Sequence, residues 1–369
     1  LSTIIISKNY FIESKLNRFE IPILILFASI GMMVLISSND LISMYLGIEL
    51  QSLALYIVAA IKRDSLSSSE SGVKYFVLGA LSSGILLYGC SLIYGFSGST
   101  NFFEIQKNLQ TLDNLNMGLI FGLVFVLVGL AFKISAVPFH MWTPDVYEGA
   151  PTSVTAFFAI VPKISGVAII YRFCLEPFGN FYSEWNQIVI FLSISSMFLG
   201  AIAAISQTNI KRLLAYSSIG HIGYILIGLA SANEAGISGV VIYMSIYAIM
   251  NIAVFSIILS LKINNNFIDK LNEFTGISKY KPLIALSMAI LMLSMSGIPP
   301  FAGFFGKFYI FMAAVNANLI LLAVLGVISS VISAFYYLRI IKIMYFDESE
   351  NLNIQLNISS QSIFILTLC

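Results

Sequence analysis

The sequence predicts an all-α membrane protein, a polytopic bundle of transmembrane helices built from two inverted five-helix repeats. Composition gives the first indication, because 58% of the 369 residues are hydrophobic and only 10% are charged. Soluble proteins carry about 25% charged residues. The second indication is that apolar runs recur at the length of a membrane-spanning helix. The third is that proline interrupts two of these runs at corresponding places, which indicates a repeat.

The apolar runs divide the chain into ten predicted spans and one partial run. A spanning helix needs roughly 20 apolar residues. The spans are 21–38, 41–61, 72–95, 117–140, 152–171, 186–206, 211–230, 237–261, 282–313 and 319–341, with the partial run from 361. The connectors are short, apart from 96–116 and 262–281. For the second of these, a short surface helix and a plain loop are both open.

These spans define four predicted parts of the chain. They are an N-terminal segment 1–20, a first repeat 21–174, a second repeat 186–345 and a C-terminal segment 346–369 that leads into a partial last helix. Five spans is an odd number, so the second repeat enters the membrane from the opposite side. This arrangement predicts inverted repeats.

Positive charge is distributed unevenly between the two sides of the bundle. With the side before the first span labelled side A, thirteen Lys and Arg residues fall in side-A segments and two in side-B loops. Cytoplasmic loops carry an excess of Lys and Arg. Side A is therefore predicted to face the cytoplasm or the mitochondrial matrix.

The fourth span of each predicted repeat contains a break. Pro138 interrupts the first broken helix and Pro299 the second, because proline lacks a backbone donor and clashes with the preceding turn. At membrane depth such a break is tolerated only where protein or a wet cavity receives the freed backbone groups. Each broken helix also carries a lysine, Lys133 or Lys307. Paired broken helices with buried charges predict an ion or proton path near the membrane midplane.

Two further charges lie in the neighbouring spans. Glu49 is well inside the second span, and Lys74 is in the third. A charge in a membrane span costs about 3 kcal/mol or more and is usually functional. Two interpretations stay open, an ion pair that tunes the proton affinity of its neighbours and a pair that only pins two helices together.

Lys133 and Lys163 are the strongest candidates for proton carriers. Burial disfavours the charged form of a lysine and a nearby carboxylate favours it, so a lysine between these influences can load and release a proton near neutral pH. The alternative is that either side chain snorkels to the membrane surface. His221 lies mid-span and suits a proton relay, although a satisfied core histidine is also open. Lys307 follows the second break and would be the terminal lysine of the path.

The loop after the first broken helix holds four residues that do not belong to this path. We expect a structural or interfacial role for His140 and predict that Trp142 anchors the helix in the aromatic belt of the membrane surface. Asp145 and Glu148 either attract protons on side A or cap the next helix.

Several functions are excluded by composition. The net charge is +1 and basic runs are absent, which argues against nucleic-acid binding. Cys90, Cys174 and Cys369 show no CxxC spacing, so neither a zinc nor an iron–sulfur site is predicted. No GxGxxG or P-loop pattern predicts a nucleotide or flavin site. We expect no cofactor and no metal in this chain.

Four segments carry a family resemblance. They are Gly47–Leu53, Ala131–Thr152, Lys211–Tyr224 and Gly297–Phe308. They resemble the antiporter-like membrane subunits of the proton-translocating NADH:ubiquinone oxidoreductase, respiratory complex I, and look closest to the subunit 2 type. The similarity runs over nearly the whole chain. The subunit 4 type differs, since it has a glutamate in the second broken helix where this chain has Lys307.

The resemblance implies the function and the site. Residues at the family's proton-translocating positions are Glu49, Lys74, Lys133, Lys163, His221 and Lys307. The chain would be an enzyme only as a subunit of the H+-translocating NADH:ubiquinone reductase, with no NADH, flavin or quinone site of its own. NADH, FMN, Fe–S clusters and ubiquinone would belong to partner subunits.

The resemblance also implies the partners. They are a subunit-4-like neighbour and the small-helix subunits of the membrane arm. Many family members have about three further N-terminal spans, and a separate chain would supply them if they are missing here. Lipids, with cardiolipin among them, are expected near the basic residues of side A.

Two questions stay open at this point. A subunit of a multi-subunit cation/proton antiporter is the alternative function, because it shares the repeats and would also use buried lysines. The Ile-, Ser- and Asn-rich, Ala-poor spans resemble organelle-encoded members of the family and predict the mitochondrial inner membrane. The alternative location is a bacterial plasma membrane.

Overall fold

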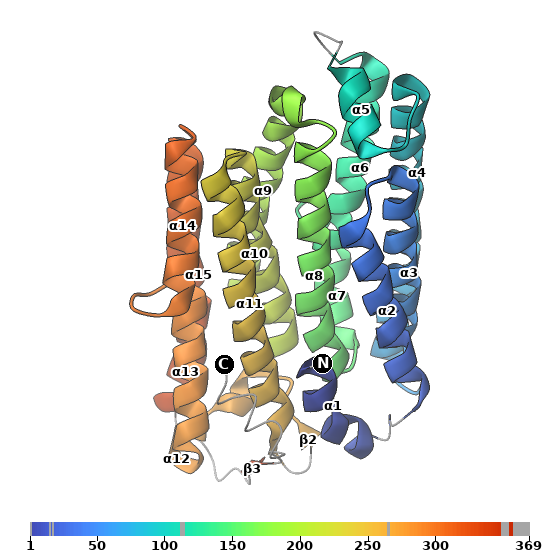
Figure 1. Cartoon of the computed structure of the whole chain (residues 1–369). Helices are drawn as coiled ribbons and strands as arrows, with labels where there is room; N and C mark the ends of the chain where they lie inside the picture. Colours follow the sequence, from blue (N-terminus) through green and yellow to red (C-terminus); the bar gives the residue numbers. More distant parts are fainter. Residues whose placement is uncertain are drawn as a thin grey trace. The chain divides into compact units, whose positions relative to one another are not determined.

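The computed structural model describes residues 2–14, 16, 18–110, 115–263, 266–347 and 354–356 (Figure 1). In this part of the chain nine helices are long and apolar enough to cross a membrane, which confirms the prediction of an all-α polytopic protein. They are α2 (Glu20–Ser37), α3 (Leu41–Ala59), α4 (Leu66–Ser97), α6 (Met117–Ile134), α8 (Thr152–Leu175), α9 (Tyr182–Ile205), α10 (Ile210–Ser231), α11 (Glu234–Ser260) and α15 (Ile320–Tyr345). The apolar run from 361 lies outside the described residues.

Both predicted helix breaks are present. Helix α6 ends at Ile134 and is followed, after a short non-helical segment, by α7 (Trp142–Gly149). In the second half α13 (Pro282–Ser296) ends before Gly297, and α14 (Ala302–Asn316) begins beyond the proline pair. The last carbonyl groups of a helix have no partner within the helix, so each break exposes polar backbone atoms inside the membrane region.

The longer connectors contain short elements. The predicted connector 96–116 holds α5 (Phe102–Leu109). The short elements of the chain are α1 (Ser2–Glu13), the 3-10 turns η1 (Gly179–Phe181) and η2 (Leu271–Phe274), α12 (Ile277–Tyr280), β1 (Leu261–Ile263), β2 (Asn266–Phe267) and β3 (Ile354–Leu356). For the connector 262–281 a helix and a loop were both open. It contains most of β1, the strand β2, the turn η2 and the short helix α12. The three strands form an antiparallel sheet in the order β2-β1-β3.

One compact unit comprises residues 18–150 and 161–195. Its helices α2 and α3 pack closely because two glycines face the opposite backbone. A Cβ atom on Gly31 would lie 2.6 Å from the backbone nitrogen of Gln51, and a Cβ on Gly47 would be similarly crowded. Small residues allow membrane helices to approach in this way. The approach holds α3, the helix that carries the membrane glutamate, firmly against its neighbour.

The other unit comprises residues 1–17, 151–160 and 196–369, in their described parts. Helix α10 is its most enclosed element, because 94% of its apolar window is buried. It contacts α11, α14 and α15. The predicted repeats 21–174 and 186–345 stay a prediction, since these units reflect contacts and not repeat symmetry.

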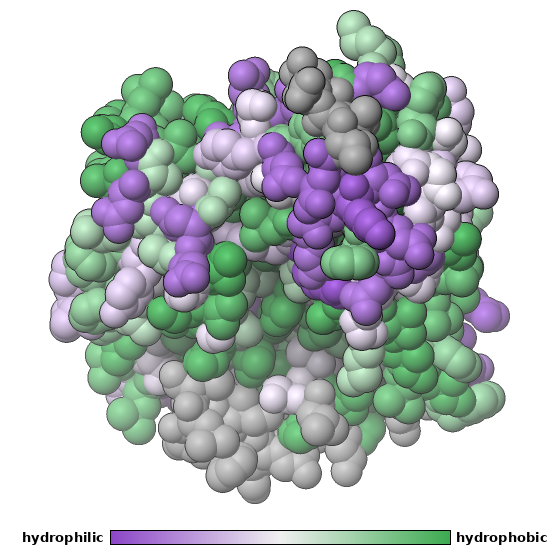
Figure 2. Space-filling model, turned by 45° about the horizontal axis from the view of Figure 1, so that its top comes forward, coloured by the Kyte–Doolittle hydropathy of each residue, from purple (hydrophilic) through white to green (hydrophobic). Residues whose placement is uncertain are grey.

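Large hydrophobic side chains remain exposed along the helices. Met33, Leu81, Phe121, Leu321 and Val331 are examples. Figure 2 shows large hydrophobic areas beside compact hydrophilic patches. Exposed apolar surface of this extent is typical of a membrane or protein interface, in agreement with a chain that spans a lipid bilayer.

Candidate functional site

Lys133 is buried at the end of the first broken helix. It lies in the last turn of α6, where a positive charge interacts favourably with the helix dipole. The residue is only 6% exposed. The Nζ atom donates a hydrogen bond of 2.7 Å to Ser52 Oγ and lies 3.5 Å from the hydroxyl of Tyr56. The ammonium group therefore points to hydroxyls of α3 and not to the membrane surface.

Glu49 lies on the same face of α3 as these hydroxyls. Residues three and seven positions apart share one side of a helix, which puts Glu49 in line with Ser52 and Tyr56. Its Oε1 atom is buried and has no hydrogen-bond partner. The carboxylate is close enough to act electrostatically on Lys133. Glu49 and Lys133 are thus brought together as charges without a direct ion pair.

Lys74 does not pair with Glu49, so the predicted ion pair is wrong. Its Nζ lies 2.7 Å from Asp145 Oδ2 and 2.7 Å from Glu70 Oε1. The side chain is 41% exposed, because it lies in the third turn of α4, near the side-A end. Lys74 and Glu49 lie at different positions along their helices, and α7 brings the carboxylate of Asp145 close to Lys74 instead. Asp145, expected to attract protons or to cap a helix, is an ion-pair partner.

Trp142 is not an aromatic-belt anchor. It is buried and stacks on Tyr75, with ring centroids 4.4 Å apart and an interplanar angle of 10°. Its Nε1 donates a hydrogen bond of 3.0 Å to the carbonyl of Phe132. Trp142 therefore adds a second hydrogen bond to a backbone carbonyl at the break, one residue before Lys133, because this carbonyl also accepts from the N–H of Ser135. His140 is half-buried and its Nδ1 has no hydrogen-bond partner.

Lys163 is the most deeply buried of the lysines in this unit, at 1% exposure. It follows Pro162 within α8, and its Nζ lies 5.7 Å from the ring centroid of Tyr147 on α7. A cation within about 6 Å of an aromatic face is attracted by the ring. Ser165, further along α8, donates a hydrogen bond of 3.3 Å to Gln51 on α3. Residues of the helices α3, α6, α7 and α8 thus surround the buried charges of this unit.

His221 lies between two tyrosines in the other unit. Its Nδ1 is 2.6 Å from the hydroxyl of Tyr243 on α11, and its Nε2 is 3.0 Å from the hydroxyl of Tyr337 on α15. Tyr337 also shares a short hydrogen bond with Ser217. A hydroxyl can donate or accept, so both neutral tautomers and the imidazolium form of His221 keep both hydrogen bonds.

Lys307 is held at the second break. Its Nζ donates 2.9 Å to the carbonyl of Ser296, the last residue of α13, and 2.8 Å to Ser330 Oγ on α15. It also lies 4.8 Å from the ring centroid of Tyr224. Gly297 makes room for it, because a Cβ there would lie 2.9 Å from Lys307 Cδ.

A narrow space separates Lys307 from His221. Its volume is about 200 Å³ in all, and Tyr224, Ser333 and Tyr336 also line it. No part of it is wide enough for a water-sized sphere. If Lys307 and His221 exchange protons as predicted, these side chains must move to admit water.

The polar partners of the buried charges in both units were not predicted from the sequence. Ser52, Tyr243, Ser330 and Tyr337 come from distant segments, and the sequence carries no signal for such pairings. Among the described residues there is no group of three or more His, Cys, Asp or Glu that could hold a metal ion.

Known proteins resemble this chain over most of its length. Residues 38–333 match the family model described as NADH:quinone oxidoreductase/Mrp antiporter, transmembrane. NADH-quinone oxidoreductase subunit N of Rhodospirillum rubrum is 56% identical over 347 residues, which cover 94% of this chain and 71% of that protein. The subunit N of Pelagibacter ubique is 56% identical over 345 residues, 94% of this chain and 73% of that protein.

Solved structures share the fold. A chain of respiratory complex I from Thermus thermophilus with bound aureothin superimposes with a TM-score of 0.81 at 32% identity, covering 95% of this chain and 76% of that one. A chain of the Mrp complex from Dietzia sp. gives a TM-score of 0.79 at 26% identity, covering 89% of this chain and 61% of that one.

Proposed function

Because the chain belongs to the family of NADH:quinone oxidoreductase and Mrp antiporter membrane subunits, we propose that it is the subunit N type of the membrane arm of NADH-quinone oxidoreductase. As such it carries protons across the membrane and does no redox chemistry of its own. The bacterial relatives carry the name subunit N. This subunit corresponds to the subunit 2 type that the sequence resembles.

One observation supports the proton-transfer role. The buried Lys133 and His221 side chains form hydrogen bonds to hydroxyl groups, which can accept from a protonated base and donate to a neutral one. Lys133 is bonded to Ser52 and His221 to two tyrosine hydroxyls. Carboxylates accept hydrogen bonds only, whereas hydroxyls both donate and accept. Ser52 therefore satisfies Lys133 as an ammonium group, and satisfies the neutral amine once its O–H turns away from the Ile48 carbonyl.

The remaining site residues take complementary roles. Glu49 is the carboxylate that favours the charged state of Lys133 and so tunes it. Lys163 and Lys307 are further carriers, each buried against an aromatic ring. Lys74 differs, because its two carboxylate partners hold it as an ammonium group. It serves as a fixed charge at the side-A end of the first half.

The chain works within a larger complex. Its partners are other complex I subunits, and we assign NADH, FMN, Fe–S clusters and ubiquinone to them. A subunit-4-like neighbour, the small-helix subunits, a separate chain with further helices and bound cardiolipin are finer proposals that rest on the resemblance.

The protein is a multi-pass membrane protein. The relatives named above are bacterial, which fits the bacterial plasma membrane. The mitochondrial inner membrane, predicted from composition, is not supported by these relatives and stays a prediction.

A cation/proton antiporter subunit is the second candidate. The likeness to the Mrp complex favours it, since that chain has nearly the same fold at 26% identity. A sodium requirement for transport would separate the two functions.

The native complex tests the proposal. Membranes would be solubilised in a mild detergent, separated by native electrophoresis, stained for NADH oxidation and analysed by mass spectrometry. We expect this chain to migrate with NADH-oxidising activity and with Fe–S subunits. Migration with other membrane subunits alone, without NADH oxidation, would overturn the proposal in favour of the antiporter.

A further inference from the structure

A further buried lysine, Lys211, lies away from the path described so far, at the start of α10. The Nζ of Lys211 is 3.4 Å from Asp269 Oδ1. The lysine side chain is 8% exposed, whereas the aspartate side chain is 50% exposed. The Oδ1 atom of Asp269 is itself buried and accepts no hydrogen bond. The Asp269 side chain is thus half-exposed, while its buried oxygen contacts a buried ammonium group.

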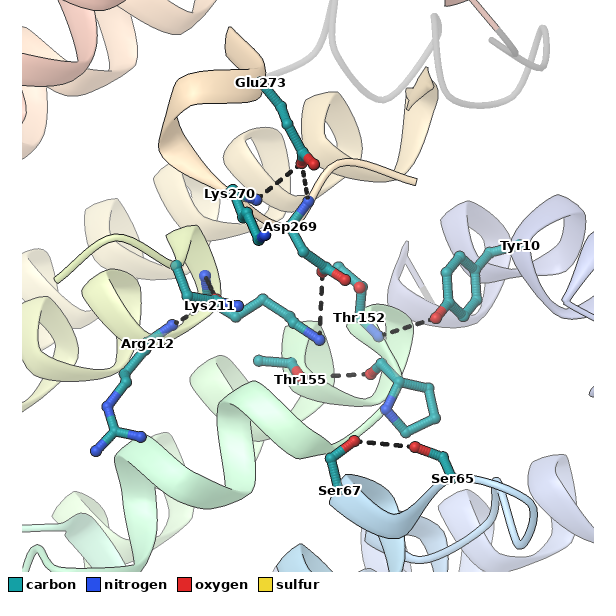
Figure 3. Close-up of polar contacts among 12 residues, drawn as sticks. Tyr10, Ser65, Ser67, Thr152, Thr155, Lys211, Arg212, Asp269, Lys270 and Glu273 are labelled. Atoms are coloured by element: carbon teal, nitrogen blue, oxygen red, sulfur yellow. Dashed lines mark hydrogen bonds and ion pairs between the residues drawn. The ribbon is translucent and has the colours of Figure 1, made fainter. Parts of the chain in front are cut away.

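The backbone holds this aspartate in place. The N–H of Ile210 donates 2.9 Å to the carbonyl of Asp269, and the N–H of Leu271 donates 2.9 Å to the carbonyl of Thr208. The Glu273 carboxylate accepts from the backbone N–H groups of Asp269 and Lys270, at 2.8 and 2.9 Å (Figure 3). The connector between α11 and α13 is therefore fastened to the first turn of α10.

The position of Lys211 is unfavourable for a purely structural lysine. It lies in the first turn of α10, where the partial positive charge of the helix dipole repels a cation. Asp269 offsets this repulsion. Removing the negative charge of Asp269 by protonation therefore weakens the hold on the ammonium group.

The Lys211 side chain points toward the first turn of α8. In Figure 3 its Nζ lies between Asp269 and the α8 residues Thr152 and Thr155. Helix α1 covers this place, because the Tyr10 hydroxyl accepts a hydrogen bond of 3.4 Å from the backbone N–H of Thr152. Burial raises the pKa of the Tyr10 hydroxyl and the charge of Asp269 adds to the effect, so Tyr10 stays protonated.

A discontinuous column of buried polar groups lies between this pair and His221. Thr155 is fully buried, and one turn further along α8 the carbonyl of Ala159 accepts a hydrogen bond of 3.0 Å from the Tyr247 hydroxyl. The side chain of Asn251 donates a hydrogen bond of 2.8 Å to the backbone carbonyl of Tyr247. The ring of Tyr247 lies 5.2 Å from that of His221, centroid to centroid.

Two buried hydroxyls on the helices α8 and α11 have no hydrogen-bond partner. They are Ser153 Oγ on α8 and Ser256 Oγ on α11. Buried polar atoms are nearly always satisfied, and ordered water is the usual partner where protein groups are lacking.

We propose that Lys211 and Asp269 form a proton-exchange site on side A that serves His221 through this column. The inference rests on the proposed function, because it takes His221 to be a proton carrier. Asp269 binds one proton from side-A water and becomes a carboxylic acid. Each hydroxyl or water along the column then gives one proton inward and receives one, His221 becomes imidazolium, and Asp269 returns to the carboxylate. Ten residues of α10 separate Lys211 from His221, roughly 15 Å at 1.5 Å per residue.

The test uses the whole complex in inside-out membrane vesicles, with NADH oxidation and proton uptake measured together. Asp269→Asn keeps the size and polarity of the side chain but cannot exchange a proton. We expect the complex to assemble, coupled turnover to fall by about tenfold, as for the loss of a general acid–base group, and the solvent deuterium isotope effect to rise. Asp269→Glu should restore most of the turnover.

The matched control is the ion pair of Lys262 with Glu13, which belongs to the same unit. Glu13→Gln breaks a lysine–carboxylate pair without touching the column, and turnover should stay at the wild-type level. Wild-type turnover in Asp269→Asn would overturn the inference, and so would an equal loss in Glu13→Gln, because the pair would then only fasten the connector. Lys307→Met separates this result from the proposed function. If it abolishes pumping while Asp269→Asn does not, only the side-A site is wrong.

Discussion

The Nζ of Lys133 lies 2.7 Å from Ser52 Oγ, a hydroxyl that can accept a hydrogen bond from an ammonium group and donate one to a neutral amine. Lys74 has the opposite environment, since Asp145 and Glu70 can only accept. In the proposed function these two lysines therefore take different tasks, one to exchange a proton and the other to keep it.

Ser52→Ala tests the partner of the proton carrier. The change leaves the buried ammonium group short of a hydrogen bond, which costs about 1–3 kcal/mol, and proton transfer should slow by about tenfold. Ser52→Thr keeps the hydroxyl and should retain activity. Coupled turnover of the assembled complex is the measurement. Ser37→Ala is the control, because Ser37 is exposed and bonds only to its own helix.

Lys74→Arg tests the fixed charge. Arginine keeps its proton under all physiological conditions and binds carboxylates well, so it should hold Asp145 and Glu70 and leave turnover near the wild-type level. Lys74→Met should lower turnover, because two carboxylates lose their counter-charge. Equal losses in both variants would mean that Lys74 releases its proton during the cycle.

Tyr337→Phe tests the relay around His221. The variant removes the hydroxyl that bonds to Nε2 and to Ser217, so one ring nitrogen loses its partner at a cost of about 1–3 kcal/mol. We expect slower proton pumping with normal assembly, and a similar result for Tyr243→Phe. Tyr280→Phe, at an exposed position, should change nothing. Unaltered pumping in both relay variants would leave His221 as a satisfied core residue.

Gly297→Ala tests the second break. Gly297 has a φ of 85°, and a Cβ would lie 2.9 Å from Lys307 Cδ. Left-handed backbone in a residue other than glycine costs about 1–3 kcal/mol, and the displaced lysine would lose its hydrogen bonds. The thermal midpoint of the complex and its pumping should both fall. Gly95→Ala is the control, because a Cβ there meets nothing within 4 Å.

The spans and breaks were predictable because they follow from local properties, namely apolar length and the missing donor of proline. The side chains that complete the site were not, since Ser52 and Tyr337 are brought to Lys133 and His221 by helix packing. Trp142 was assigned to the membrane surface because an amphipathic ring near a helix end is typical there. The stacking on Tyr75 that buries it joins residues 67 positions apart. The roles of the six candidate residues stay predictions until they are tested.

Lys133→Arg tests the central claim most directly. Arginine keeps the positive charge and the capacity to donate hydrogen bonds but cannot release a proton. The measurement is NADH-driven proton uptake by inside-out vesicles that contain the assembled variant complex. We predict that uptake and coupled turnover fall by at least about tenfold while assembly is retained. Uptake near the wild-type level would contradict the account, because a charge alone would then suffice at this position.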